Sequence, residues 1–179
     1  MKPCNVLVLP GWHGSGPAHW QSRWEQRHGY RRVEQHDWDR PLRGDWLARL
    51  EDLVLACDEA PVLVAHGLGC IQAAAWAANS RNASRAKAAL LVAPLDVERE
   101  DLRPQLPTWS PIALDALPFT SVVVASADDP LCVPQRTRVL AAAWRSQLVT
   151  QPAGQHLNSS SGLGSWPEGH VLLQDLMKD

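Results

Sequence analysis

The segment from Val62 to Cys70 has the pattern of a buried strand, a sharp turn and a helix, with Gly67 at the centre of the turn. In a nucleophile elbow, a small-x-Ser-x-Gly turn lifts a serine hydroxyl above a parallel sheet. Ala65 and Gly69 occupy the two small positions, but Gly67 stands where the serine would be. These residues favour either an elbow without its nucleophile or an ordinary glycine-containing turn.

Two later segments contain the residue types that assist a nucleophile. Asp128 and Asp129 follow a candidate strand, and His156 follows the last candidate strand. A carboxylate at a strand end can orient a histidine, although Asp-Asp-Pro is also a common turn and a loop histidine is often only polar surface. The order elbow, aspartate, histidine is typical of α/β-hydrolases and favours reading the three together.

A glycine-rich loop, Pro10–Gly16, follows the first candidate strand. Its three glycines would let backbone N–H groups face a ligand, but a plain turn explains them as well. No Gly-Lys-Ser/Thr follows, so the loop is not a phosphate-binding loop. His66 belongs to the elbow and is expected to support the turn rather than to perform chemistry.

Buried-strand and helix patterns alternate along the chain, which indicates a mostly parallel sheet with helices on both faces. We expect strands at 6–9, 32–36, 61–65, 90–93, 121–125 and 147–150, and helices at 45–57, 68–78, 134–144 and 168–177. The proline-rich stretch 98–118 should form an excursion over one edge of the sheet and border the pocket. No linker divides the chain, so residues 1–179 are expected to form a single domain without a large lid.

The composition is that of an ordinary globular protein, with 45% hydrophobic and 20% charged residues and a net charge of -2. This charge does not predict nucleic-acid binding, and no apolar run predicts a membrane span or a signal peptide. The four cysteines are scattered, so we expect no metal, no cofactor and a cytoplasmic location. The nine tryptophans should lie in the core or form pocket walls; the candidate walls are Trp12, Trp20, Trp109 and Trp166.

Several motifs together resemble the small, lidless serine hydrolases of the YdeN-like group, which are related to retinoblastoma-binding protein nine. The resemblance extends over nearly the whole chain and is carried by Pro10-Gly11-Trp12, Ser15-Gly16-Pro17, His19-Trp20-Gln21, Trp24, Asp37-Trp38, Pro41, Val64-Ala65-His66, Leu68-Gly69-Cys70, Ser126, Asp129-Pro130, His156-Leu157-Asn158, Ser161-Gly162-Leu163-Gly164, Trp166-Pro167 and Gly169.

The resemblance implies an α/β-hydrolase that acts on a small-molecule ester or amide. Its nucleophile position falls on Gly67, its acid on Asp129 rather than Asp128, and its base on His156. The backbone N–H groups of Trp12 and Leu68 would form the oxyanion hole. Candidate substrate contacts are Trp12, His13, His66 and Trp166.

The sequence departs from this family pattern at Gly67 and at Gln155, which replaces the glycine usual before the histidine. The first departure predicts negligible esterase activity, through either natural loss or a deliberate substitution. An alternative is a pseudoenzyme that uses the pocket to bind a ligand or partner. The sequence does not predict the oligomeric state.

Overall fold

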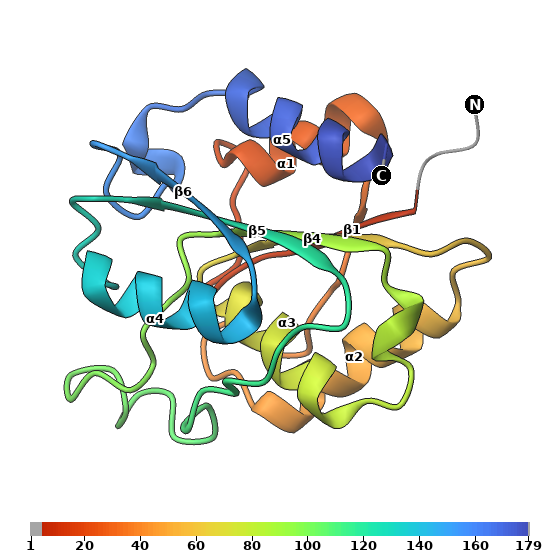
Figure 1. Ribbon diagram of the computed structural model, residues 1–179, viewed down its shortest axis with the longest axis horizontal. Helices are drawn as coiled ribbons and strands as arrows, with labels where there is room; N and C mark the ends of the chain where they lie inside the picture. Colours follow the sequence, from red (N-terminus) through yellow and green to blue (C-terminus); the bar gives the residue numbers. More distant parts are fainter. Residues whose placement is uncertain (1–4, 179) are drawn as a thin grey trace.

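The computed structural model describes residues 5–178. Six strands form one sheet in the order β2-β1-β3-β4-β5-β6, and every neighbouring pair is parallel. Helices α1 and α5 lie on one face of the sheet, and α2, α3 and α4 lie on the other (Figure 1). The strands are β1 (Val6–Leu9), β2 (Arg31–Arg32), β3 (Val62–His66), β4 (Ala88–Val92), β5 (Thr120–Ser126) and β6 (Gln147–Gln151). The helices are α1 (Trp20–His28), α2 (Arg43–Leu55), α3 (Leu68–Asn79), α4 (Pro134–Trp144) and α5 (Pro167–Lys178), with short 3-10 turns η1 (Ala83–Arg85) and η2 (Ser159–Ser161).

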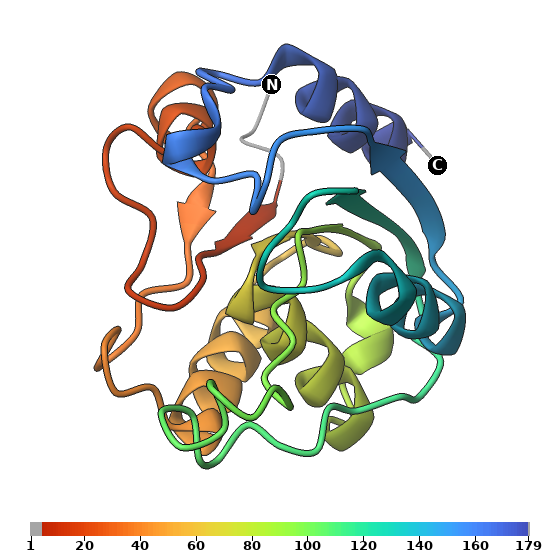
Figure 2. The same cartoon turned by 90° about the vertical axis from the view of Figure 1, so that its left-hand side faces the viewer.

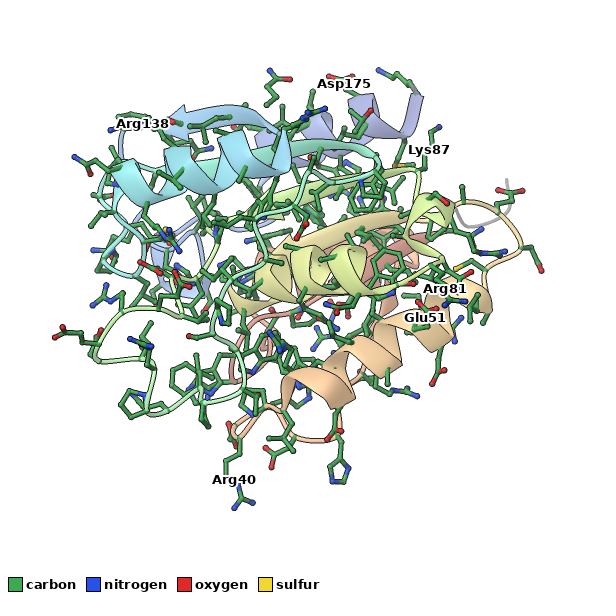
Figure 3. The ribbon with its side chains drawn as sticks, turned by 60° about the horizontal axis from the view of Figure 1, so that its bottom comes forward. Arg40, Glu51, Arg81, Lys87, Arg138 and Asp175 are labelled. Carbon is green, nitrogen blue, oxygen red and sulfur yellow. The ribbon has the colours of Figure 1, made fainter. Side chains whose placement is uncertain are left out.

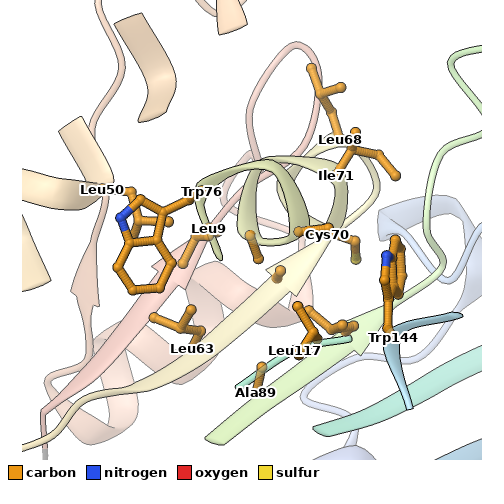
Figure 4. Close-up of a cluster of buried hydrophobic side chains, with 14 of the residues drawn as sticks. Leu9, Leu50, Leu63, Leu68, Cys70, Ile71, Trp76, Ala89, Leu117 and Trp144 are labelled. Atoms are coloured by element: carbon orange, nitrogen blue, oxygen red, sulfur yellow. The ribbon is translucent and has the colours of Figure 1, made fainter. Parts of the chain in front are cut away.

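The four central strands β1, β3, β4 and β5 are almost entirely buried, as expected for strands covered on both faces. On the α3 face, apolar side chains from the strands pack against the helix, as Leu9, Leu63 and Trp76 illustrate in Figure 4. The opposite face holds a second cluster, in which Trp20 of α1 and Trp166, the residue before α5, gather with strand residues such as Val64. Both faces of the sheet therefore contribute to the core.

Most of the expected elements are confirmed, with ends that move by one or two residues. Helix α1 was not expected from the sequence, and the second strand is only Arg31–Arg32 rather than 32–36. Helix α2 begins at Arg43, two residues before the expected start at 45, with Leu42 at its N-cap.

The excursion 98–118 lies along the face that carries α2 and α3, and not beside the cavity described below (Figure 1). Trp109 anchors it, since its indole is buried against Trp46 and donates from Nε1 to the carbonyl of Pro41 over 2.9 Å. The excursion thus extends the core instead of forming a pocket wall. Charged side chains such as Arg40, Arg138 and Asp175 lie at the periphery of the molecule (Figure 3).

Candidate active site

A cavity of about 250 Å³ lies at the carboxyl edge of the sheet, where the loops after β1, β3 and β6 meet. This is the edge at which parallel α/β sheets bind ligands. In Figure 2 the loop after β6 (blue) lies beside α1 (orange). His19, which precedes α1, and His156, in the loop after β6, both line the cavity. Leu95 and Leu131 form an apolar part of the cavity wall.

Gly67 lies at the turn between β3 and α3 with φ +56° and ψ -119°. An L-residue rarely adopts this backbone conformation, whereas glycine does so without strain. An ideal Cβ on Gly67 would lie 3.2 Å from Nε2 of His156 and 3.8 Å from Cα of Gly11. Any side chain at position 67 would therefore start beside the imidazole of His156.

The imidazole of His156 is paired with a buried carboxylate. Its Nδ1 lies 3.0 Å and 3.2 Å from the two carboxylate oxygens of Asp129, which is only 5% exposed. The neighbouring Asp128 instead accepts from the backbone N–H of Gln155 over 2.8 Å, and this hydrogen bond lowers the pKa of Asp128. Asp129 is thus the carboxylate that contacts the ring, and Asp128 fixes the loop.

Three side chains hold the main chain around His156. Three consecutive carbonyls, those of residues 155–157, accept hydrogen bonds from Ser126 Oγ, His66 Nε2 and Trp20 Nε1, respectively, the last two over 2.8 Å each. These donors come from β5, β3 and α1, so three separate elements position the loop. The loop needs this support because Gln155 and Leu157 both have positive φ, near +48° and +49°.

Two further histidines lie behind His156. Burial, together with the nearby rings of His156 and His19, holds the pKa of His66 well below its usual value. Burial and the charge of Arg32 lower the pKa of His19 from 6.5 to about 4. Both rings are therefore neutral at physiological pH.

The first turn of α3 and the loop after β1 supply backbone donors. The first N–H groups of a helix have no intrahelical acceptor, and that of Leu68 is the first in α3. The loop packs closely on this turn: an ideal Cβ on Gly11 would lie 3.0 Å from the carbonyl oxygen of His66 and 3.4 Å from the nitrogen of Leu68. Trp12 and Leu68 both line the cavity, and neither of their backbone N–H groups has a backbone acceptor within residues 5–178.

The structure brings most of the sequence-predicted site residues to one cavity, but not all of them. Gly67, Leu68, His156, Trp12, His13 and His66 line it, and Asp129 lies directly behind His156. Trp166 does not line it: its indole is 2% exposed and packs against Trp20 and Trp24. Its position makes Trp166 a support for α1 rather than a substrate contact.

Sequence reasoning missed His19, Leu95 and Leu131 as lining residues, and missed Trp20 and Ser126 as supports of the His156 loop. The adjacent residues His19 and Trp20 were the sequence signal for a lining residue and a loop support at the start of α1. His19 caps α1 by accepting from the N–H of Gln21, and Trp20 then reaches the far loop.

Cys57, Cys70 and Cys132 are free and buried. The thiol of Cys70 donates to the carbonyl oxygen of Val92 over 3.3 Å, and the same oxygen accepts from the backbone N–H of Gly67 over 3.0 Å. Within residues 5–178 no group of three or more histidine, cysteine or acidic side chains is arranged to hold a metal. Cys4 lies outside the described residues. In the same range, no helix has the length and apolar character needed to cross a membrane.

The parallel sheet, the elbow between β3 and α3 and the Asp–His pair at its carboxyl edge define the α/β-hydrolase fold. The similarity extends to the sequence, since a family model described as serine hydrolase matches residues 6–175. The chain therefore belongs to the serine hydrolase family, and to its YdeN-like members.

Solved structures agree with this assignment. A YdeN-like hydrolase from Pectobacterium atrosepticum is 25% identical, with a TM-score of 0.86 over 99% of this chain and 92% of the other. The ydeN gene product of B. subtilis is 20% identical, with a TM-score of 0.83 over 98% and 100% of the two chains. Esterase 2 of Thermogutta terrifontis shares the fold, with 20% identity and a TM-score of 0.70 over 99% and 85% of the two chains. A search of curated proteins gives no significant match.

Proposed function

We propose that this chain retains the site of a carboxylesterase-like serine hydrolase whose nucleophile position is occupied by Gly67. One observation carries the proposal: a Cβ on Gly67 would start 3.2 Å from Nε2 of His156, whose Nδ1 is held by Asp129. A serine at this position would bring its hydroxyl to a ring nitrogen that is ready to accept a proton.

The roles of the neighbouring groups follow from acyl-transfer chemistry. In a chain with serine at position 67, His156 takes the hydroxyl proton while Oγ attacks the substrate carbonyl carbon. Asp129 holds the ring with its proton on Nδ1 and stabilises the imidazolium that forms. The N–H groups of Trp12 and Leu68 would bind the oxyanion. The proton on Nε2 then passes to the leaving oxygen or nitrogen, and a water repeats the sequence to release the acid.

Without the hydroxyl, no covalent intermediate forms. Loss of a serine nucleophile typically lowers turnover by on the order of 10⁶-fold, and the remaining groups act through binding and oxyanion stabilisation alone. Neither Cys70 nor Ser15 replaces it, because Cys70 is buried with a pKa raised well above its usual value, and Ser15 donates to Gln21 over 2.6 Å. We therefore propose negligible esterase turnover for the chain as it stands.

The test is hydrolysis of p-nitrophenyl acetate and butyrate by four proteins: the chain itself, Gly67→Ser, Gly67→Ala, and Gly67→Ser combined with His156→Ala. The alanine variant is the matched control, since it adds the same Cβ and backbone strain without the hydroxyl. We expect turnover and labelling by a fluorophosphonate probe only in the Gly67→Ser protein. A folded Gly67→Ser protein without activity, or equal activity in all four, would refute the assignment of nucleophile and base.

A second candidate function is ligand binding by a protein that no longer turns over substrate. The observation that favours it is the intact site: His156 and the loop after β1 line the cavity, and Asp129 holds the ring of His156, although Gly67 cannot attack. A ligand bound only by the folded protein raises its midpoint of thermal unfolding. Screening small acids, esters and amides would therefore detect it, and a complete lack of shifts would count against it. The buried free thiols support a cytoplasmic location for either function.

A further inference from the structure

The ring of His66 presents a fixed lone pair at the cavity. Its Nε2 lies 2.8 Å from the carbonyl oxygen of His156, and because a carbonyl can only accept, Nε2 carries the hydrogen. The neutral ring therefore has its lone pair on Nδ1. His66 lines the cavity, and its one side-chain hydrogen bond within the described range 5–178 is that of Nε2 with the His156 carbonyl.

His156 presents a second lone pair beside the first. Its Nδ1 faces the carboxylate of Asp129, so the hydrogen of the neutral ring lies there and Nε2 is the acceptor. Nε2 is the atom nearest to an ideal Cβ placed on Gly67, at 3.2 Å. The centres of the His66 and His156 rings are 4.8 Å apart. The cavity thus contains two neighbouring acceptors.

Donors border the same cavity. Nδ1 of His19 accepts from the N–H of Gln21, so Nε2 of His19 carries the hydrogen. This Nε2 is buried and has no hydrogen-bond partner among the described residues, in a side chain that is only 4% exposed and lines the cavity. An unpaired buried donor is unfavourable and calls for an acceptor. Trp12 and Leu68 line the same cavity, and their backbone N–H groups, which have no backbone acceptor within residues 5–178, are further donors.

We infer that this cavity binds a primary carboxamide, with the carbonyl oxygen on the N–H donors and the NH₂ group on the lone pairs of His66 and His156. The apolar remainder of the ligand would lie against Leu95 and Leu131. The inference uses the cavity of the proposed function but does not depend on a nucleophile. A carboxylate fits less well because it would face two lone pairs, and the lining contains no lysine or arginine. An ester fits less well because it has no N–H to donate.

Butyramide, butyrate and methyl butyrate are similar in shape and differ in these groups, so they form the test series. Their dissociation constants would be measured at pH 8 on the chain as it stands, by titration monitored through backbone amide NMR signals. We expect butyramide to bind at least tenfold more tightly than the other two and to shift the amide signals of Gly67 and Leu68. Absent butyramide binding, shifts elsewhere only, or equal or tighter binding of butyrate would overturn the inference.

Two substitutions at His66 separate its nitrogens, because asparagine places an acceptor near the position of Nδ1 and glutamine places a donor near that of Nε2. We expect His66→Asn to keep the preference for the amide while losing the bond to the His156 carbonyl, and therefore to lower the melting temperature. His66→Gln should do the reverse. A folded His66→Gln protein that keeps the full tenfold preference would refute the role of Nδ1.

The substitution His19→Asn is a second test of the inference, and it leaves the hydrogen bonds to the His156 loop in place. Asparagine is a favoured N-cap, so helix α1 keeps its cap while the Nε2 donor is removed. We expect weaker butyramide binding by a factor of five or more, with a melting temperature close to that of the unchanged chain. Unchanged affinity would remove His19 from the site. The Gly67→Ser activity assay is independent of these results, so a failed amide preference and a failed hydrolase assignment are distinguishable.

Discussion

Replacing Gly69 by alanine should destabilise this protein, although alanine is the better helix former. Gly69 is the second residue of α3, where α3 approaches β1. An ideal Cβ on Gly69 would lie 2.2 Å from the carbonyl oxygen of Leu9 and 3.0 Å from that of Pro10. Both obstacles are backbone atoms of the segment that leads into the cavity, so no side-chain rotation can relieve the contact.

The magnitude follows from the size of this overlap. Cβ contacts under 3.0 Å are essentially absent from real proteins, so α3 and β1 must separate by about 0.8 Å at this point. Overpacking of this kind typically costs 1–3 kcal/mol, while alanine in a helix gains up to about 1 kcal/mol over glycine. Because the overlap is large and involves backbone on both sides, we expect Gly69→Ala to lower the free energy of unfolding by about 2 kcal/mol.

The assay is urea unfolding at 25 °C, followed by tryptophan fluorescence. Gly44→Ala is the matched control, since Gly44 is the second residue of α2 and its ideal Cβ would meet nothing within 4 Å. Helix propensity alone predicts that both substitutions stabilise the protein, whereas the packing predicts opposite signs. A Gly69→Ala protein as stable as the unchanged chain would show that α3 does not approach β1 this closely.

Two further outcomes concern titration. The pKa of His19 is about 4 in the folded protein and 6.5 in the unfolded chain. The contribution of His19 to stability is therefore complete above pH 6.5 and is lost as the pH falls towards 4, a change on the order of 3 kcal/mol. The lowered pKa of His66 acts in the same direction. Urea unfolding at pH 7.5 and pH 5 should show about 2 kcal/mol of this decline, and His19→Asn should reduce it, whereas an identical pH dependence in that variant would contradict the assignment. Burial raises the pKa of Cys132 to about 11 and that of Cys70 well above its usual value, so both thiols should resist iodoacetamide at pH 8 until urea is added. Peptide mass spectrometry measures this, and rapid alkylation of Cys70 in the folded protein would show that the elbow opens.

Local sequence patterns predicted the central sheet because its strands are continuous apolar runs ended by turn residues. The strands β1, β3 and β5 were therefore found almost at their observed bounds. Helix α1 was missed because its apolar face consists of Trp20 and Trp24 among polar residues, and Gln21 and Ser22 are buried through hydrogen bonds. A helix held in this way has no apolar periodicity to detect.

Parts of the site depend on contacts that no local pattern encodes. Trp20 reaches the carbonyl of Leu157 across 137 positions of sequence, and only the folded chain reveals it. Trp166 was expected at the cavity, because composition alone does not distinguish a pocket tryptophan from a buried one. The strand-turn-helix pattern of the elbow was visible in the sequence. That a side chain at position 67 would point towards His156 follows only from the backbone angles of Gly67 and the position of the His156 ring.

The bonds to the carbonyls of residues 155–157 also have an evolutionary consequence. They tie α1, β3 and β5 to one loop, so substitutions in Trp20, His66 or Ser126 weaken the fold as well as the placement of His156. Purifying selection for a folded protein is then enough to preserve this geometry in a lineage that has no hydroxyl at position 67. In any such lineage, a single codon change at position 67 would place a side chain beside an imidazole that the fold itself has kept in position.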